Sequence, residues 1–128
     1  MKFTTKRGTG AVDQLDASMN HFKLTLVWTH TFYNEQTSQL AAVHLDKNQT
    51  LAVAAQLHNF IHSRAIIVGE HGSEKEKLFM YTEDNGRTLH LDGKVDKSQM
   101  VGGTYTMNKA DAKILLDYIN ANREPIEQ

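Results

Sequence analysis

The sequence predicts a single α+β domain, in which an antiparallel sheet of five to six strands packs against two helices. Residues 22–32 alternate between an apolar and a polar face, with the period of two that a half-buried strand requires. Asp-Asn-Gly at 84–86 separates two more strand-like segments, 78–83 and 87–91, and is typical of a tight turn. Residues 49–63 carry apolar side chains at helical spacing.

The N-terminal segment, residues 1–21, gives the least regular pattern, and we expect a partly irregular arm there. In the strand that follows, Trp28 and His30 fall on the apolar face, so His30 is interpreted as a core histidine. Polar residues 34–38 predict a turn. The apolar segment after it predicts a return strand, although residues 38–46 fit a strand or a helix equally well.

The middle of the chain predicts a helix over 49–63 with Asn48 as its N-cap, because asparagine is a favoured capping residue. Residues 65–69 form a short continuous apolar segment and predict a central strand. The polar residues 71–77 predict a solvated loop.

The C-terminal part contains two more glycine signals, at Asp92-Gly93 and at Gly102-Gly103, which predict a second hairpin turn and a loop before a short last strand. Asn108 then caps a helix that ends near Asn122 or Arg123, and residues 124–128 form a tail. The inner stripe of this helix comprises Ala112, Leu115, Leu116 and Ile119. The predicted order is β-β-α-β-β-β-(β)-α, without an internal repeat.

The composition fits one domain over residues 1–128. The sequence has no cysteine, no apolar segment of the roughly 18 residues that cross a bilayer, and no secretory signal pattern, so a soluble cytoplasmic protein is expected. Fourteen Lys and Arg against 15 Asp and Glu leave a net charge of −1, which disfavours nucleic acid as a partner without excluding it. Seven histidines make the chain histidine-rich.

Two histidines, His58 and His62, are separated by four residues on a predicted helix and could share a metal ion such as zinc. Zinc needs at least one more protein ligand, and Asn59 stands where a zinc-protease helix has glutamate. The competing interpretation places His58 at the border of the core and His62 on the surface. We therefore expect no cofactor and keep a divalent metal at these two residues as an alternative.

Binding is favoured over catalysis, because no nucleophile motif occurs and the acidic pairs fall in turns. The main prediction is a non-enzymatic protein-binding, inhibitory or adaptor module that associates with itself, most simply as a homodimer. An 11-residue strand is about twice the usual length and would extend beyond its own domain. Its weakly charged polar face offers a flat binding surface formed by Lys23, Thr25, Thr29 and Thr31.

The second alternative is a single-stranded nucleic-acid-binding protein. Aromatic residues on strands could stack on bases, and basic residues lie on the adjoining hairpins. The aromatic candidates are Phe79, Tyr81 and Tyr105, and the basic ones are Arg87, Lys94 and Lys97. A glycine, a short strand ending at Asn108 and an amphipathic helix also resemble the end of PC4-like coactivator domains. The sequence leaves the ligand, the oligomeric state and the pathway open.

Overall fold

The protein is built from two antiparallel four-stranded sheets and two helices, as seen in a computed structural model that describes all residues except 7–9, 33–35, 64–65, 97–99 and 123–128. The first half contains β1 (Lys2–Lys6), β2 (Val12–Asn20), β3 (Lys23–Thr31), β4 (Thr37–His44) and α1 (Lys47–His62). The second half contains β5 (Val68–Gly72), β6 (Glu76–Glu83), β7 (Thr88–Asp96), β8 (Met100–Met107) and α2 (Lys109–Asn122).

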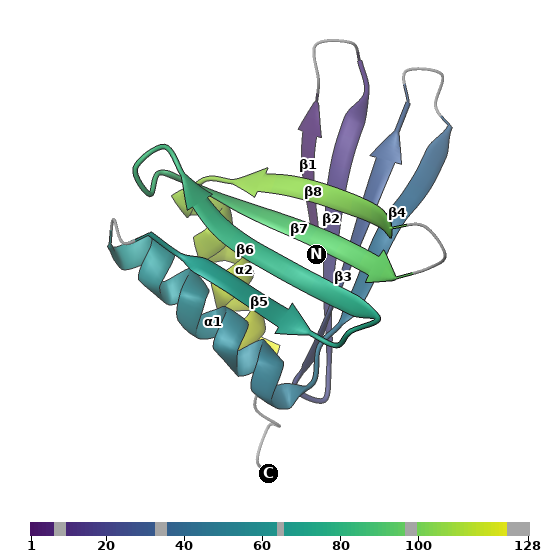
Figure 1. The fold of residues 1–128 in the computed structure, drawn as a ribbon. Coiled ribbons are helices and arrows are strands. Elements are labelled where there is room, and N and C mark those ends of the chain that lie inside the picture. The colour runs from purple at the N-terminus through teal and green to yellow at the C-terminus, as the bar shows by residue number, and fades with distance from the viewer. Residues whose placement is uncertain (7–9, 33–35, 64–65, 97–99, 123–128) are drawn as a thin grey trace.

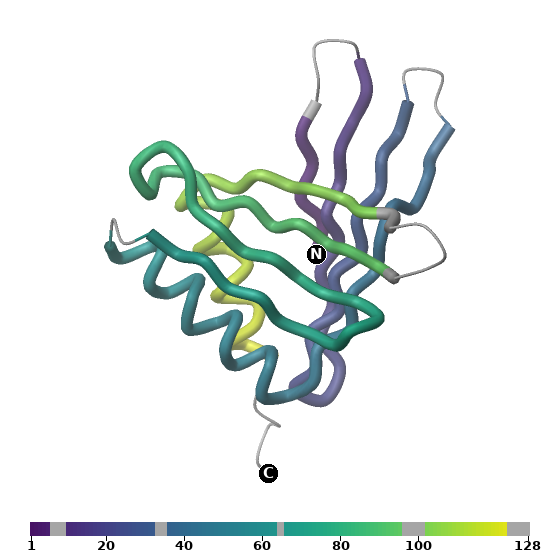
Figure 2. The backbone as a smooth tube through the Cα atoms, in the orientation of Figure 1, coloured from purple at the N-terminus to yellow at the C-terminus, as the bar shows by residue number. Residues whose placement is uncertain are grey.

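The α+β class is confirmed, but the predicted number and order of strands are wrong. Within the described residues there are eight strands, and each sheet pairs its strands in chain order. Each half therefore has the same order, four strands and then a helix. The strands of the two sheets cross steeply, and the helices lie together beside them (Figure 1). The smooth backbone trace shows this crossing most clearly (Figure 2).

The N-terminal segment is part of the first sheet, so the prediction of an irregular arm is wrong. β1 pairs with β2 in antiparallel register, from Lys2 opposite Asp16 to Lys6 opposite Val12. The inward residues Leu15 and Ala17 of β2 are fully buried. This strand was missed because Val12, Leu15 and Met19 also match the spacing of one helix face.

The strand predicted at 22–32 is β3, and it has nine residues, Lys23–Thr31. Its alternation is confirmed, since Leu24, Leu26 and Trp28 are buried. Phe22 lies instead in a turn and has a positive φ of 71°. The argument that an overlong strand extends to a second copy of the chain therefore no longer holds, and the homodimer remains an untested prediction.

The two sheets meet at Trp28 of β3. Its indole N–H donates a hydrogen bond to the carbonyl of Leu91 on β7 at 3.0 Å, and its ring packs on Gly93 and Gly103. These two glycines are register partners on β7 and β8. The turn predicted at Asp92-Gly93 and the loop predicted at Gly102-Gly103 are therefore wrong: both glycine signals lie within strands, where Gly93 and Gly103 make room for the tryptophan ring.

Helix α1 begins two residues earlier than predicted, with Asp46 rather than Asn48 as its N-cap. The Asp46 carboxylate accepts from the backbone N–H of Gln49 at 2.7 Å, and the Gln49 side chain accepts from the backbone N–H of Asp46 at 2.9 Å. This reciprocal capping box satisfies donors that a helix start leaves free. One turn on, the buried Thr50 hydroxyl accepts from the backbone N–H of Leu24 and ties α1 to β3.

Helix α2 agrees with its prediction. The backbone N–H of Asp111 donates to the Asn108 side chain at 2.8 Å, and the predicted inner stripe is buried. Lys109, at the first turn of α2, donates to the carbonyl oxygens of Phe60 and Ser63 at the end of α1. A cation at a helix C-terminus is favourable, so this contact joins the two halves.

The segment around β5 also differs from its prediction. The central strand expected at 65–69 is an edge strand, Val68–Gly72, and the loop expected at 71–77 is largely strand. The ambiguous residues 38–46 fall mostly in strand β4. The turn at 84–86 is confirmed, with positive φ at all three residues. Within the described residues, neither helix is long and apolar enough to span a bilayer.

Candidate functional site

The second sheet has one face turned away from the first sheet and the helices. Along β6, Leu78 and Met80 point inward and are fully buried, so the alternate residues lie on the opposite side. We call this side the open face. It comprises Val68 and Glu70 of β5, Lys77, Phe79 and Tyr81 of β6, His90, Asp92 and Lys94 of β7, and Thr104 and Thr106 of β8.

Strand register arranges the open face in three rows. The first row runs from Val68 to Tyr81 to His90 to Thr106, and the second from Glu70 to Phe79 to Asp92 to Thr104. The third row places Lys77 opposite Lys94. Neighbours within a row are one strand spacing apart, about 4.8 Å, and successive rows are two residues or about 6.7 Å apart. Aromatic, acidic and basic groups thus lie within a small area.

The aromatic part of the open face starts with Tyr81 and His90. Their rings stack with centroids 4.9 Å apart and an interplanar angle of 8°. The His90 ring is held on both nitrogens, by Glu83 at 3.2 Å from Nε2 and by Thr106 at 3.1 Å from Nδ1. His90 thus lies beside Tyr81 on the open face.

The basic part of the open face brings two like charges together. Lys94 lies with its ammonium 4.8 Å from the centroid of the Phe79 ring. Lys77 forms an ion pair with Glu70 at 2.8 Å, and the hydrogen bond and charge of Glu70 raise the pKa of Lys77. Lys77 and Lys94 are direct cross-strand partners, and like charges at such positions are unfavourable by themselves.

Asp92 lies between these two parts. Its carboxylate accepts a hydrogen bond from the hydroxyl of Thr104 on one side. On the other side it accepts from the hydroxyl of Tyr81; burial and then this hydrogen bond raise the pKa of that tyrosine. Sequence reasoning missed Asp92 as a surface residue because Asp-Gly is also a common turn signal.

The predicted nucleic-acid contacts separate into two groups. Phe79, Tyr81 and Lys94 share the open face, whereas Tyr105 is 4% exposed and its hydroxyl accepts from Thr5 at 3.1 Å. Arg87 is exposed in the turn between β6 and β7. Lys97 lies outside the described residues. Tyr105 is therefore a core residue and is removed from the set of base-stacking candidates.

The predicted binding residues of β3 lie on the outer face of the other sheet. Lys23 is exposed, and Thr25, Thr29 and Thr31 are partly exposed. Thr31 shares a hydrogen bond of 3.0 Å with Thr37 of β4. Their use as a binding surface stays a prediction. His30, on the inner side, is partly buried and held by Asp13 at 2.7 Å.

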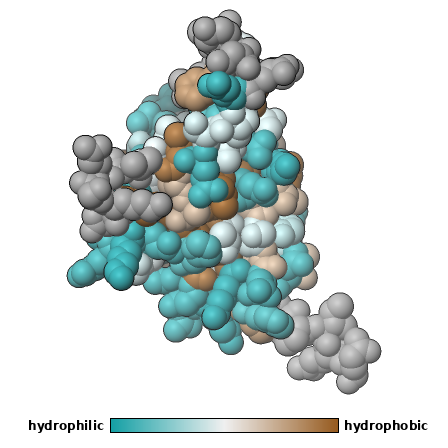
Figure 3. Space-filling view, turned by 90° about the vertical axis from the view of Figure 1, so that its right-hand side faces the viewer, coloured by the Kyte–Doolittle hydropathy of each residue, from teal (hydrophilic) through white to brown (hydrophobic). Residues whose placement is uncertain are grey.

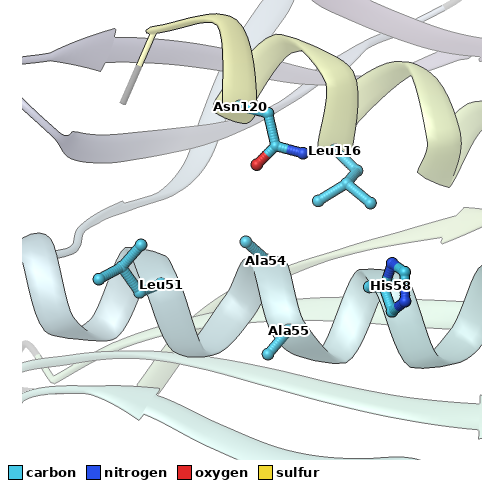
Figure 4. A pocket seen from close by; sticks show the side chains of 6 residues that line it. All are labelled: Leu51, Ala54, Ala55, His58, Leu116 and Asn120. Atoms are coloured by element: carbon cyan, nitrogen blue, oxygen red, sulfur yellow. The ribbon is translucent and has the colours of Figure 1, made fainter. Parts of the chain in front are cut away.

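The predicted metal ligands His58 and His62 lie on successive turns of α1, with ring centroids 4.4 Å apart. His58 also borders a shallow cavity of about 250 Å³ between α1 and α2, opposite Leu116 (Figure 4). The described part of the chain contains no cluster of three His, Cys, Asp or Glu residues able to hold a metal. The metal site stays a prediction, and no third ligand has been found for it among those residues.

A second concave region lies along the edge strand β4. It has a volume of about 350 Å³ and is lined by residues of β4 and by Glu76 and Val95 of the second sheet. Glu76 also accepts from the backbone N–H of His44 at 2.6 Å, which links the two sheets at this edge. On this side of the molecule, hydrophobic residues are interspersed with hydrophilic ones (Figure 3).

Comparison with known proteins shows the fold. Crystal structures of Trypanosoma brucei MRP1/MRP2 match 95% of this chain and 81% of theirs, with a TM-score of 0.71 and 12% identity. The structure of a guide-RNA-binding protein complex bound to a guide RNA matches 94% of this chain and 86% of its own, with a TM-score of 0.70 and 12% identity. The structure of the plant transcriptional regulator PBF-2 matches 94% of this chain and 79% of its own, with a TM-score of 0.57 and 10% identity. No protein-family model and no curated protein sequence matches.

These comparisons correct the sequence-based function. The prediction of a protein-binding, inhibitory or adaptor module is contradicted, because proteins that share this fold include a complex described as binding guide RNA. The argument from net charge against nucleic acid as a partner is not supported either, because the structures that share this fold include one bound to a guide RNA. It relied on the net charge of the whole chain, whereas charge can be concentrated locally on one face.

Proposed function

We propose that this protein binds single-stranded nucleic acid on the open face of its second sheet. Two independent lines support the proposal. The fold is that of a guide-RNA-binding complex, and the open face combines aromatic rings with a lysine pair. The most important observation is that Lys77 and Lys94 lie in the row next to Phe79. The two lysines can bind a phosphate while the neighbouring ring stacks on a base.

The aromatic rings provide the sequence-tolerant part of the interaction. Every base has a π-face, and stacking on a protein aromatic ring contributes about 1–3 kcal/mol per base. Phe79 and Tyr81 are two residues apart on one strand, so their side chains can receive successive unstacked bases. The bases of a duplex are already stacked and paired, so this face favours a single strand.

The lysine pair provides the electrostatic part. Two ammonium groups on directly opposite residues repel one another, and Glu70 and the Phe79 ring relieve that repulsion only in part. A phosphate between them removes the remaining repulsion. Lys77 and Lys94 with Arg87 would neutralise three phosphates, which corresponds to a slope of about −2 in log K against log salt for a single strand.

The proposal is tested with the full chain and a fluorescein-labelled 12-nucleotide uridine oligomer in a fluorescence anisotropy titration at low salt. The F79A/Y81A double variant should bind at least about tenfold more weakly, from the loss of two stacking contacts. F32A is the matched control, because Phe32 is an exposed aromatic residue directly after β3 of the first sheet. It should bind like the unchanged protein.

Two results would contradict the proposal. One is the absence of binding to any single strand at low salt. The other is a loss of affinity in K23A and F32A that equals or exceeds the loss in F79A/Y81A, which would move the contact surface to the first sheet. A labelled hairpin duplex of the same length serves as competitor and should displace the single strand poorly.

A further inference from the structure

We infer that Asp92 makes the open face prefer a base whose edge donates two adjacent hydrogen bonds, which is guanine. The inference deepens the proposed function and rests on it, because it concerns the base that lies next to the Phe79 ring. It rests on the position of the carboxylate, on the hydrogen bonds that hold it and on the donor pattern of the bases.

The position of Asp92 is the first step. It is the cross-strand partner of Phe79 on one side and of Thr104 on the other. Along its own strand it stands between His90 and Lys94. A base that stacks against Phe79 therefore has its edge about one strand spacing from the Asp92 backbone, within reach of the carboxylate.

The two existing hydrogen bonds fix the carboxylate without saturating it. The hydroxyls of Thr104 and Tyr81 both donate to it. An ionised carboxylate has about four acceptor sites, so two remain for a ligand. Because neighbours on β6 and β8 hold the group, little rotamer entropy is lost when a base binds, and a preorganised acceptor discriminates better than a mobile one.

The chemistry of the base edges decides which base gains most. A carboxylate only accepts, so it rewards donors and repels carbonyl oxygens. Guanine presents an N–H and an amino group side by side and can bond both carboxylate oxygens. Cytosine and adenine each offer one amino group beside an acceptor. Uracil and thymine offer a single N–H between two carbonyls, which makes them the least favourable bases at this position.

Asp92 also directs the strand. Negative charges on Asp92 and Glu70 in the second row repel phosphates, whereas Lys77 and Lys94 in the third row attract them. The sugar-phosphate backbone is therefore placed over the lysine row, with the bases turned toward Phe79 and Asp92. A purely structural Asp92, which only braced Tyr81 and Thr104, would require no particular base.

The experiment compares three labelled 12-mers: uridine throughout, uridine with one central guanosine, and uridine with one central inosine. Inosine keeps the ring N–H and lacks the amino group, so it isolates the second hydrogen bond. The unchanged protein should bind the guanosine oligomer roughly fivefold or more tightly than the uridine oligomer, the low end for a bidentate base contact. Inosine should fall between them.

The decisive variant is D92N, whose amide offers one donor and one acceptor in place of two acceptors. It should bind all three oligomers within about twofold of one another, and at least as tightly as the unchanged protein binds uridine, since a repulsive charge is gone. D117N is the control, because it removes one carboxylate from the exposed face of α2. It should keep the full preference.

Each outcome decides between the claims. Equal binding of the three oligomers by the unchanged protein, or a guanosine preference that survives in D92N, overturns the role of Asp92 while leaving the proposed function intact. The T104A variant provides a second test that keeps the carboxylate, and its guanosine preference should shrink. If no oligomer binds at all, the proposed function itself is wrong and the inference falls with it.

Discussion

The indole ring of Trp28 occupies the space in which a side chain on Gly93 would lie. A β-carbon built on Gly93 would overlap the six-membered ring of Trp28, and one on the neighbouring Gly103 would stand 2.5 Å from the Trp28 β-carbon. Glycine in the interior of a strand weakens the strand, so its presence at both positions reflects this close approach. The two sheets can approach this closely because Gly93 and Gly103 have no side chains.

Replacing Gly93 by alanine should destabilise the protein by about 1–3 kcal/mol or more, as expected when atoms are forced into a packed core. Urea unfolding followed by tryptophan fluorescence gives the change directly. G102A is the comparison, because Gly102 lies on the open face, where an added β-carbon would stand 3.1 Å from the Gly93 carbonyl oxygen and 3.8 Å from Cγ of Lys94 and would not meet the Trp28 ring. A G93A variant as stable as G102A would contradict the packing described here.

Alanine variants of Asp46 and Asn48 test which of these two residues is the N-cap of α1. D46A should cost about 1 kcal/mol, because it breaks a reciprocal capping box. N48A should change stability little, since Asn48 is inside the helix and exposed. Urea midpoints of the two variants, measured side by side, check this. If N48A lost more stability than D46A, Asn48 would be the N-cap, as the sequence predicted.

The stability of the protein should fall in mild acid partly through His71. Burial lowers the pKa of His71 in the folded chain below its ordinary value of 6.5, and its Nε2 lies 2.6 Å from Oε1 of Gln56 on α1. Below about pH 6.5 the unfolded chain binds a proton that the folded chain resists, so stability is lost as the pH falls toward the folded-state pKa.

This dependence is measured from urea midpoints between pH 7.5 and 5.5. The H71Q variant keeps a side chain able to donate to Gln56 but cannot titrate, so its midpoint should fall less steeply with pH. H62Q is the control, because His62 is an exposed histidine at the end of α1. Equal slopes for H71Q and the unchanged protein would refute a role for His71.

Two tyrosines that look alike in the sequence should behave differently. Y105F removes a partly buried hydroxyl that accepts from Thr5, and should lower stability by roughly 0.5–1.5 kcal/mol without weakening oligonucleotide binding. Y81A should weaken binding with little loss of stability, because Tyr81 lies on the open face. Thermal unfolding and anisotropy on the same preparations check both, and the reverse pattern would exclude the open face as the interface.

The lysine pair should control the salt dependence of binding. Replacing both Lys77 and Lys94 by glutamine should reduce the slope of log K against log salt by about 1.4, from two lost phosphate contacts at about 0.7 each. K113Q, on the exposed face of α2, is the control and should keep the slope. An unchanged slope in the double variant would show that the phosphates bind elsewhere.

Helices, strands and turns could be predicted where the residue pattern fits only one kind of element. The alternation around Trp28 matches no helix, and the turn at 84–86 has the residues that positive φ requires. Strand β2 was not predicted because the spacing of its apolar residues fits one face of a helix as well as a strand. Gly93 and Gly103 were misread because a glycine that ends a strand and one that admits a neighbouring ring look the same in sequence.

The candidate site was predictable only in part. Phe79, Tyr81 and Lys94 were recognised as residue types that suit nucleic acid, but the whole-chain charge argued against that ligand. Their proximity depends on the register of β6 and β7, which sequence spacing does not reveal. Asp92 became visible only after Gly93 was placed within a strand, and Tyr105 was removed because it points inward from β8.

The hydrogen bond from Trp28 to Leu91 has a practical consequence for locating the interface by mutagenesis. It anchors the sheet that bears the open face to a residue of the other half of the chain, and Lys109 ties the two helices together in the same way. Loss-of-binding variants collected at random will therefore scatter over both halves, many of them through a reduced folded fraction. Only variants corrected for the amount of folded protein will trace the outline of the contact surface.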